Sequence, residues 1–294
     1  MITDLKAAVE THLTGRSEME GAFQTAAPGL VLTRTATPVL PTYLLYKPVL
    51  AVILQGAKQV AVGDSMFRYA AGQGLVVGVD VPAFGSVTRA SRTEPYLGMT
   101  LELDFTAMRE MAERAAMAPA TMGVDGVFVY DCSAPVIDCL ARLVRLLTTP
   151  DAIPSVQPLI VRELCYWMLA GPQGRDVRGL VMSKTAAPRL FDAVHTLREN
   201  YQRPVRIDDL ATAAAMSPSS FYQRFKALTA LTPLQYQKQM RLAEARHLLT
   251  DDEPNVAAVA YRVGYESVSQ FHREYKRAFG RSPRDDAKPK IVAS

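Results

Sequence analysis

The sequence predicts a two-domain α+β protein. The N-terminal part is expected to form a β-barrel with flanking helices, and the C-terminal part an all-α domain with two helix–turn–helix motifs. Two observations support this prediction. Residues 29–104 are short apolar runs separated by Gly, Pro and Asp, which is typical of β-strands. Residues 207–283 contain one helical pattern twice, 49 or 50 positions apart. At 294 residues, the chain is long enough for two domains with separate cores.

The expected boundaries follow the change in pattern along the chain. We predict an N-terminal domain over residues 1–174, a linker over 175–188 and a C-terminal domain over 189–294. The linker is polar and ends in Pro188. Within the C-terminal domain the two helix–turn–helix units are expected at about 207–229 and 256–279.

The N-terminal segment predicts many short strands followed by helices. Regularly spaced strands favour a sandwich or a small barrel. Helical patterns follow at 105–117, 135–147 and 156–170, with a late strand at 126–131. These helices carry more apolar residues than one small barrel needs. They indicate either a homodimer interface, since symmetric dimers are the commonest oligomers, or packing against the barrel.

The residues of the predicted barrel do not indicate catalysis. The four histidines are His12, His195, His247 and His272, and none lies within residues 29–104, so a site of two histidines and a carboxylate is unavailable there. The sequence has no GxSxG, Walker A or complete GxGxxG motif. We therefore predict no enzymatic activity, no metal and no cofactor. The barrel interior is expected to hold a small-molecule effector, or nothing.

The three cysteines, Cys132, Cys139 and Cys165, lack metal-site spacing. Their odd number argues against a disulfide framework and fits a reducing cytoplasm. Two interpretations stay open: a thiol sensor activated by nearby arginines, or buried cysteines that behave as small apolar residues. No apolar run approaches 18 residues and the N-terminus is polar, so neither a membrane span nor a secretory signal is expected.

Each copy of the C-terminal repeat reads as helix, tight turn, helix. The apolar face of the first helix is Ile207, Leu210, Ala211 and Ala214 in one copy, and Val256, Val259, Ala260 and Val263 in the other. Ser217 and Ser267 are predicted N-caps of the second helices, and Gln270 would complete a capping box with Ser267. The turn of the second copy is one residue longer.

The solvent faces of the second helices carry the functional signal. One stripe at helical spacing holds Ser219, Tyr222, Gln223 and Lys226, and the same positions in the second copy hold Ser269, His272, Arg273 and Lys276. Hydrogen-bonding and basic side chains on a short helix after a tight turn are what a recognition helix needs in a DNA major groove. The alternative is an ordinary solvated face. The predicted DNA-binding residues are Ser219, Tyr222, Gln223, Arg224, Lys226, Ser269, Gln270, His272, Arg273 and Lys276.

The distribution of charge supports this interpretation. Residues 189–294 contain 17 Lys and Arg against 12 Asp and Glu, whereas residues 1–188 contain 16 against 17. The modest basic excess therefore lies on the half that would bind phosphates.

The segment from about Arg189 to Arg284 resembles the DNA-binding domain of the AraC/XylS family of bacterial transcription regulators. The matching pieces are LATAAAMSPSSFYQRFKALTALTPLQYQKQMRLAEARHLL and VAAVAYRVGYESVSQFHREYKRAFGRSP, about a third of the chain. The resemblance implies two helix–turn–helix units joined by a long helix, here expected from Pro233 to about Leu249. It also implies base-facing side chains at Ser219, Tyr222, Gln223, Ser269, Gln270 and Arg273. Ala230 and Leu231 depart from the Gly-x that commonly ends the first recognition helix of the family.

The strand-rich segment is similar to the cupin-like N-terminal domain of one branch of that family. The sequence thus predicts a cytoplasmic regulator that binds double-stranded DNA, responds to a small-molecule effector, forms a homodimer and can meet RNA polymerase at promoters. The rival hypothesis is an enzyme or carrier whose helical domain is only a platform for partners. A narrower rival is a constitutive regulator with an empty barrel.

Overall fold

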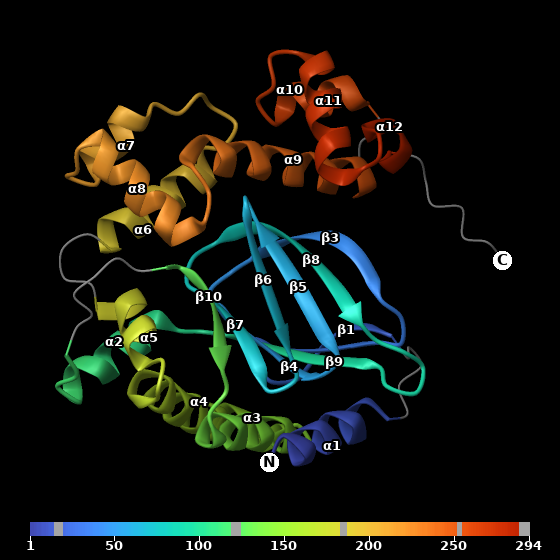
Figure 1. Ribbon diagram of the computed structural model, residues 1–294, viewed down its shortest axis with the longest axis vertical. Helices are drawn as coiled ribbons and strands as arrows, with labels where there is room; N and C mark the ends of the chain where they lie inside the picture. Colours follow the sequence, from blue (N-terminus) through green and yellow to red (C-terminus); the bar gives the residue numbers. More distant parts are fainter. Residues whose placement is uncertain (15–19, 119–124, 183–186, 252–254, 288–294) are drawn as a thin grey trace. The chain divides into compact units, whose positions relative to one another are not determined.

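The computed structural model describes residues 1–14, 20–118, 125–182, 187–251 and 255–287. The chain divides into two compact units whose main boundary lies between Pro188 and Arg189 (Figure 1).

The first unit contains two antiparallel sheets. The six-stranded sheet has the order β1-β2-β9-β4-β7-β10, and the four-stranded sheet has the order β3-β8-β5-β6. The strands are β1 (Gly21–Gln24), β2 (Leu30–Thr35), β3 (Val39–Tyr46), β4 (Val49–Gln55), β5 (Ala57–Val62), β6 (Ser65–Ala70), β7 (Gln73–Val77), β8 (Val81–Arg89), β9 (Tyr96–Glu102) and β10 (Val127–Asp131). The strand-rich character and the late strand are therefore confirmed.

The two sheets correct the expectation of a β-barrel, because they do not join into a closed ring within the described residues. The chain changes sheet between β4 and β5 at Gly56, which has φ +89°. A Cβ at this position would lie 2.4 Å from the Arg89 carbonyl oxygen, so only glycine fits the crossing. The resulting architecture is the sandwich that the sequence left open beside the barrel.

Helices cover one face of the six-stranded sheet (Figure 1). They are α1 (Ile2–Leu13), α2 (Phe105–Arg114), α3 (Ala134–Leu146), α4 (Ile153–Ala170) and α5 (Gly174–Met182), with the short 3₁₀ helix η1 (Pro150–Ala152) before α4. Leu50 and Met99 of the sheet share one core with Leu140 of α3 and Leu164 of α4. Much of the apolar surface of α3 and α4 is thus used inside the unit, as the packing alternative predicted.

The predicted linker over 175–188 requires a correction. Its first part belongs to α5, and Val177, Leu180 and Val181 of that helix are buried in the core of the first unit. The segment looks polar in the sequence because it starts with charged residues, but Val177, Leu180 and Val181 have the spacing of an apolar helical face. Residues 183–186 lie outside the described residues.

The described part of the second unit is all-helical. It contains α6 (Ala187–Glu199), α7 (Ile207–Ala213), α8 (Pro218–Thr229), α9 (Pro233–Asp251), α10 (Val256–Arg262), α11 (Val268–Phe279) and the short α12 (Pro283–Asp286). The predicted apolar face of α6 is buried through Leu190, Ala193, Val194 and Leu197. Helices α7 and α8 form the first helix–turn–helix unit, and α10 and α11 form the second.

Helix α9 is one long helix that connects the two helix–turn–helix motifs of the second unit. It begins as predicted, because Thr232 Oγ1 accepts a hydrogen bond from the Gln235 amide nitrogen at 3.2 Å while Gln235 Oε1 accepts one from the Thr232 amide at 2.9 Å. Its 19 residues correspond to a rise of about 28 Å. Tyr236 near its start is fully buried beside Phe225 of α8, and Leu242, Ala245 and Leu249 share a core with α10 and α11.

Candidate nucleic-acid interface

Buried aromatic side chains anchor α8 and α11 in the second unit. In α8, Phe221 and Phe225 are fully buried with ring centroids 5.6 Å apart. In α11, Phe271 and Tyr275 are fully buried with centroids 5.4 Å apart. Because the buried positions of the two copies correspond, both helices present corresponding faces to solvent.

The exposed face of α8 holds all five residues predicted for it. Ser219, Tyr222, Gln223, Arg224 and Lys226 are exposed. Within the described residues, none of their side chains makes a hydrogen bond, ion pair or ring contact. Tyr222 is a large aromatic residue with 41% of its surface exposed, although a ring of this size usually packs against the protein. This face is therefore available to a partner.

The exposed face of α11 holds four of its five predicted residues. Ser269, Gln270, Arg273 and Lys276 are exposed. The fifth, His272, is half-buried at the edge of this face, where its ring lies edge-on to Phe271 with centroids 6.2 Å apart. The helical spacing alone placed His272 on the stripe, but its angular position brings it against the aromatic core.

Arg277 is a further candidate that was not among the predicted DNA-binding residues. It is exposed in the last turn of α11, four residues after Arg273 and hence on the same side of the helix. The sequence does indicate Arg277 through its i, i+4 spacing from Arg273. The comparison of the two copies does not, because the matching position of the first copy is Ala227.

The predicted capping box between Ser267 and Gln270 is wrong in one respect, because only one of its two hydrogen bonds is present. Ser267 Oγ does accept a hydrogen bond from the Gln270 amide nitrogen at 3.3 Å. The Gln270 side chain, however, donates to Glu274 Oε1 at 3.4 Å instead of returning to Ser267. Glu274 also accepts from the Tyr265 hydroxyl at 2.9 Å and pairs with Lys238 of α9 at 3.8 Å. A single carboxylate thus orients the Gln270 amide and ties α11 to α9.

Tyr265 stays a proton donor in this network. Burial, and then the hydrogen bond to the Glu274 carboxylate, raise the pKa of the Tyr265 phenol. A neutral phenol beside Glu274 keeps that carboxylate as the acceptor, so Gln270 remains held through its amide nitrogen.

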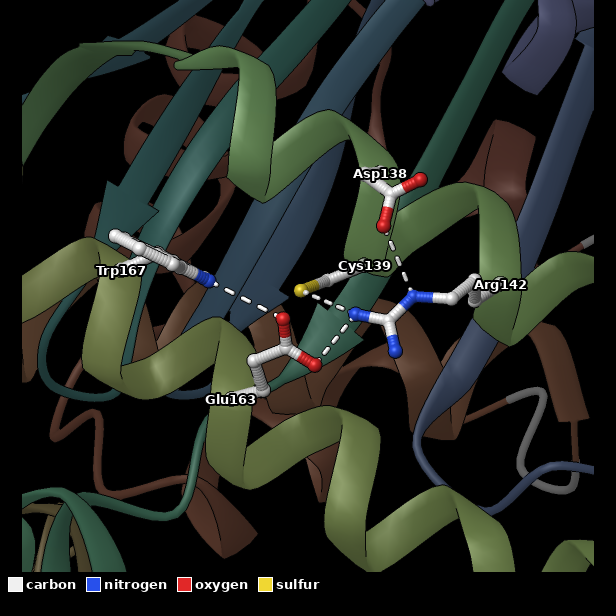
Figure 2. Close-up of polar contacts among 5 residues, drawn as sticks. All are labelled: Asp138, Cys139, Arg142, Glu163 and Trp167. Atoms are coloured by element: carbon white, nitrogen blue, oxygen red, sulfur yellow. Dashed lines mark hydrogen bonds and ion pairs between the residues drawn. The ribbon is translucent and has the colours of Figure 1, made fainter.

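The cysteines lie in the first unit, where Figure 2 shows Cys139 among the polar residues that join α3 and α4. Arg142 Nη2 donates to Cys139 Sγ at 3.3 Å and to Glu163 Oε2 at 2.5 Å, and the Trp167 indole nitrogen donates to Glu163 Oε1 at 3.3 Å. Cys139 and Cys165 are buried. Burial raises the pKa of all three thiols, to about 12 for Cys132 and Cys165.

These shifts favour the buried, unreactive interpretation of the cysteines. Because burial disfavours the thiolate, we expect iodoacetamide to label none of the three in the native chain at pH 7.5 on the time scale at which it consumes free cysteine. All three should react in concentrated urea. The rate of native labelling, followed by mass spectrometry, should still rise above pH 9. A rate that levels off below pH 8 would instead identify an activated thiol.

Among the described residues, no group of three or more His, Cys, Asp or Glu could hold a metal ion. In the same part of the chain, no helix is both long and apolar enough to cross a membrane.

Comparisons with known proteins agree with this architecture. A family model for the AraC-type transcriptional regulator N-terminus matches residues 26–176, and a helix-turn-helix domain model matches residues 210–288. The HTH-type transcriptional activator RhaS of Escherichia coli is 33% identical over 102 residues, which are 35% of this chain and 37% of RhaS. The chain thus matches little more than a third of that relative.

The fold is similar to that of a solved regulator. ToxT from Vibrio cholerae matches 90% of this chain and 97% of its own, with a TM-score of 0.57 and 12% identity. ToxT with a bound unsaturated fatty acid matches 95% of this chain and 100% of its own, with a TM-score of 0.55 and 10% identity. The N-terminal family model alone covers just over half of the chain. The chain therefore belongs to the AraC-type transcriptional regulators, and its second unit contains a helix-turn-helix domain.

Proposed function

We propose that the chain binds a specific double-stranded DNA site through α8 and α11, and that a small-molecule effector held by the first unit controls this binding. The observation that carries the proposal is the pair of matching recognition helices. Each presents hydrogen-bonding and basic side chains that make few or no contacts within the described protein. We assign no catalytic step to the first unit. The proposed binding to DNA implies a cytoplasmic location.

Residue roles follow from side-chain chemistry. Arg273 suits bidentate recognition of guanine, and Gln223 and Gln270 suit adenine. Ser219, Ser269 and Tyr222 can donate to or accept from base edges. Lys226, Lys276 and Arg224 are suited to phosphates, which set register without reading sequence. The rise of about 28 Å along α9 is close to the roughly 34 Å between successive major grooves on one DNA face.

Effector control would operate through a population shift. A ligand that binds one arrangement of the two units more tightly changes the fraction competent for DNA by its difference in affinity. ToxT, which is similar in fold, has been solved with a bound unsaturated fatty acid, and this supports ligand binding by the present chain. A bound operator beside a promoter would also bring the chain close to RNA polymerase.

The deciding experiment is DNase protection on genomic fragments around the gene for this chain, with and without a cell extract as effector source. A discrete footprint of two consecutive helical turns per monomer is expected. Absence of protection, together with no affinity better than micromolar for any fragment, would favour the rival class of an enzyme or carrier.

We also propose that the chain forms a homodimer through α4. This helix buries Ile160 and Leu164 but exposes Val156, Leu159 and Tyr166, with Leu159 67% exposed. The same helix lines most of an apolar surface hollow of about 460 Å³, formed by Ala26, Pro28, Pro150, Ile153, Pro154, Gln157, Pro158 and Val161. Covering this apolar area with a second copy would remove it from water.

Leu159→Lys is accordingly expected to convert the dimer into a monomer at micromolar concentration, because it places an ammonium in the apolar contact. Sedimentation equilibrium measures the change. Leu40→Lys is the matched control, since Leu40 is even more exposed, at 84%, but lies on β3. A dimer that survives Leu159→Lys, or that dissociates with Leu40→Lys, would contradict this interface.

A further inference from the structure

A lysine and three tyrosines meet inside the first unit. Lys58 of β5 is partly buried, and its Nζ donates to the Tyr46 hydroxyl at 3.0 Å and lies 5.6 Å from the centroid of that ring. Tyr46 ends β3, Tyr69 is in β6 and Tyr96 begins β9, and their exposed fractions are 8%, 3% and 5%. Four strands thus bring one ammonium and three phenols together.

Both sheets contribute to this group. Lys58 pairs in register with Tyr69 and Val87, and Tyr46 with Val81, so the three polar residues share a face of the four-stranded sheet with buried valines. Tyr96 comes from the six-stranded sheet. Alternation along the strands therefore places the group on the inner face of the sandwich, where apolar residues would be expected.

Two glycines make room for these side chains. A Cβ at Gly85 would lie 3.1 Å from Lys58 Cε, and a Cβ at Gly98 would lie 2.5 Å from the Tyr96 hydroxyl. Any side chain at Gly98 would displace the Tyr96 phenol. The strands are thus shaped around the polar group, which is difficult to reconcile with a lysine that merely extends its ammonium to solvent.

The polar atoms of the group are incompletely satisfied. No carboxylate pairs with Lys58 within the described residues, where its only hydrogen-bond partner is Tyr46. The Tyr69 hydroxyl is buried close to the Tyr46 hydroxyl but completes no hydrogen bond, and the Tyr96 hydroxyl makes none in the same part of the chain. Buried polar groups are normally paired, so this group lacks an acceptor of hydrogen bonds.

The directions of the pKa shifts indicate which charges the group carries at neutral pH. Burial lowers the pKa of Lys58, but the neighbouring phenols of Tyr46 and Tyr96 raise it, and the net shift is upward. Burial raises the pKa of Tyr69 and of Tyr96. At neutral pH the group therefore consists of an ammonium and neutral phenols, which is a set of donors with a net positive charge.

We propose that Lys58, Tyr46, Tyr69 and Tyr96 bind the carboxylate of an organic acid that serves as the effector. One carboxylate oxygen would accept from Lys58 and Tyr46 and the other from Tyr69 or Tyr96, while the phenol rings and the valines contact the organic part. This inference rests on the proposed effector control, because it names the chemical class of the ligand.

The test is calorimetric titration of the full chain with acetate, hexanoate and phenylacetate, each beside its neutral amide. Binding of at least one acid at millimolar concentration or below is expected, with its amide at least about tenfold weaker. Lys58→Met should weaken acid binding at least about tenfold and leave amide binding unchanged. Tyr69→Phe, which keeps the ring, should weaken acid binding several-fold.

Lys47→Met is the matched control, since Lys47 is an exposed lysine next to Tyr46. It should change the affinity for the acids less than twofold. No binding of any acid, equal affinity for acid and amide, or equal effects of the two lysine variants would each overturn the proposal.

A second measurement separates this inference from the proposed function. The affinity of each lysine variant for the footprinted DNA is measured with and without the bound acid. Acid binding that depends on Lys58 but leaves DNA affinity unchanged would retain the carboxylate site and refute effector control by it. If no DNA site is footprinted but acid binding is intact and depends on Lys58, only the proposed function is refuted.

Discussion

Arg273→Ala is expected to weaken binding to the specific DNA site by about 1–3 kcal/mol, roughly 5- to 150-fold. The guanidinium lies on the exposed face of α11, six residues after the Ser267 N-cap, and makes no hydrogen bond or ion pair within the described residues. Its removal therefore breaks no hydrogen bond or ion pair among the described residues. A bidentate contact to a guanine would disappear, so the preference at one base position should relax.

Lys226→Ala provides the comparison for this prediction. Lys226 is exposed on α8, and as a phosphate contact it should weaken specific and non-specific DNA alike and lower the salt slope of binding by about 1. Fluorescence anisotropy with the footprinted site, its single-base variants and a scrambled duplex at three salt concentrations measures both effects. If Arg273→Ala weakens all duplexes equally, Arg273 is a phosphate contact and the assignment of base reading is wrong.

Much of the second unit was predictable because its signals are local. The apolar positions of α7, α8, α10 and α11 repeat at helical spacing, and the same positions are buried in both copies. Caps such as Thr232 and Ser267 involve residues three apart, which a sequence displays directly. The exposed residues of α8 followed as the complement of the buried ones.

The remaining features depend on contacts between distant residues. Lys58, Tyr46, Tyr69 and Tyr96 stand on four strands, and only the pairing of those strands brings them together. The open arrangement of the two sheets depends on the crossing at Gly56, where the Arg89 carbonyl leaves no space for a side chain. Gln270 turned toward Glu274 because Tyr265 and Lys238 hold that carboxylate, and neither partner follows from the capping pattern.

The two copies of the repeat also differ at their left-handed positions. Ala215 and Ala230 of the first copy have φ of 53° and 56°, whereas the corresponding residues of the second copy are Gly264 and Gly280, with φ of 93° and 70°. A left-handed conformation costs a non-glycine residue about 1 kcal/mol. In the first copy two alanines adopt this conformation despite its cost. A left-handed backbone alone therefore does not explain the glycines of the second copy.

Close approach of another segment supplies the reason at Gly264 but not at Gly280. A Cβ at Gly264 would lie 2.1 Å from the Gln202 carbonyl oxygen. That carbonyl accepts from Arg241 Nη2 at 3.1 Å, and Arg241 Nε donates to the Tyr201 carbonyl at 2.8 Å. The segment at Gln202 is therefore tied to α9 and has little freedom to retreat. At Gly280, none of the described residues other than its own neighbours along the chain has an atom within 4 Å of the position that a Cβ would occupy.

Gly264→Ala is therefore expected to destabilise the chain by about 3 kcal/mol or more, as conformational strain adds to overlap with a fixed carbonyl. Gly280→Ala adds only the strain of a left-handed alanine, so it should lower the free energy of unfolding by about 1 kcal/mol. Urea unfolding followed by far-UV circular dichroism measures both free energies. Equal costs would show that the segment at Gln202 yields to the new methyl group. A larger cost at Gly264 would show that Arg241 holds it, and hence that packing between the helix–turn–helix unit and α9 selects glycine at this turn.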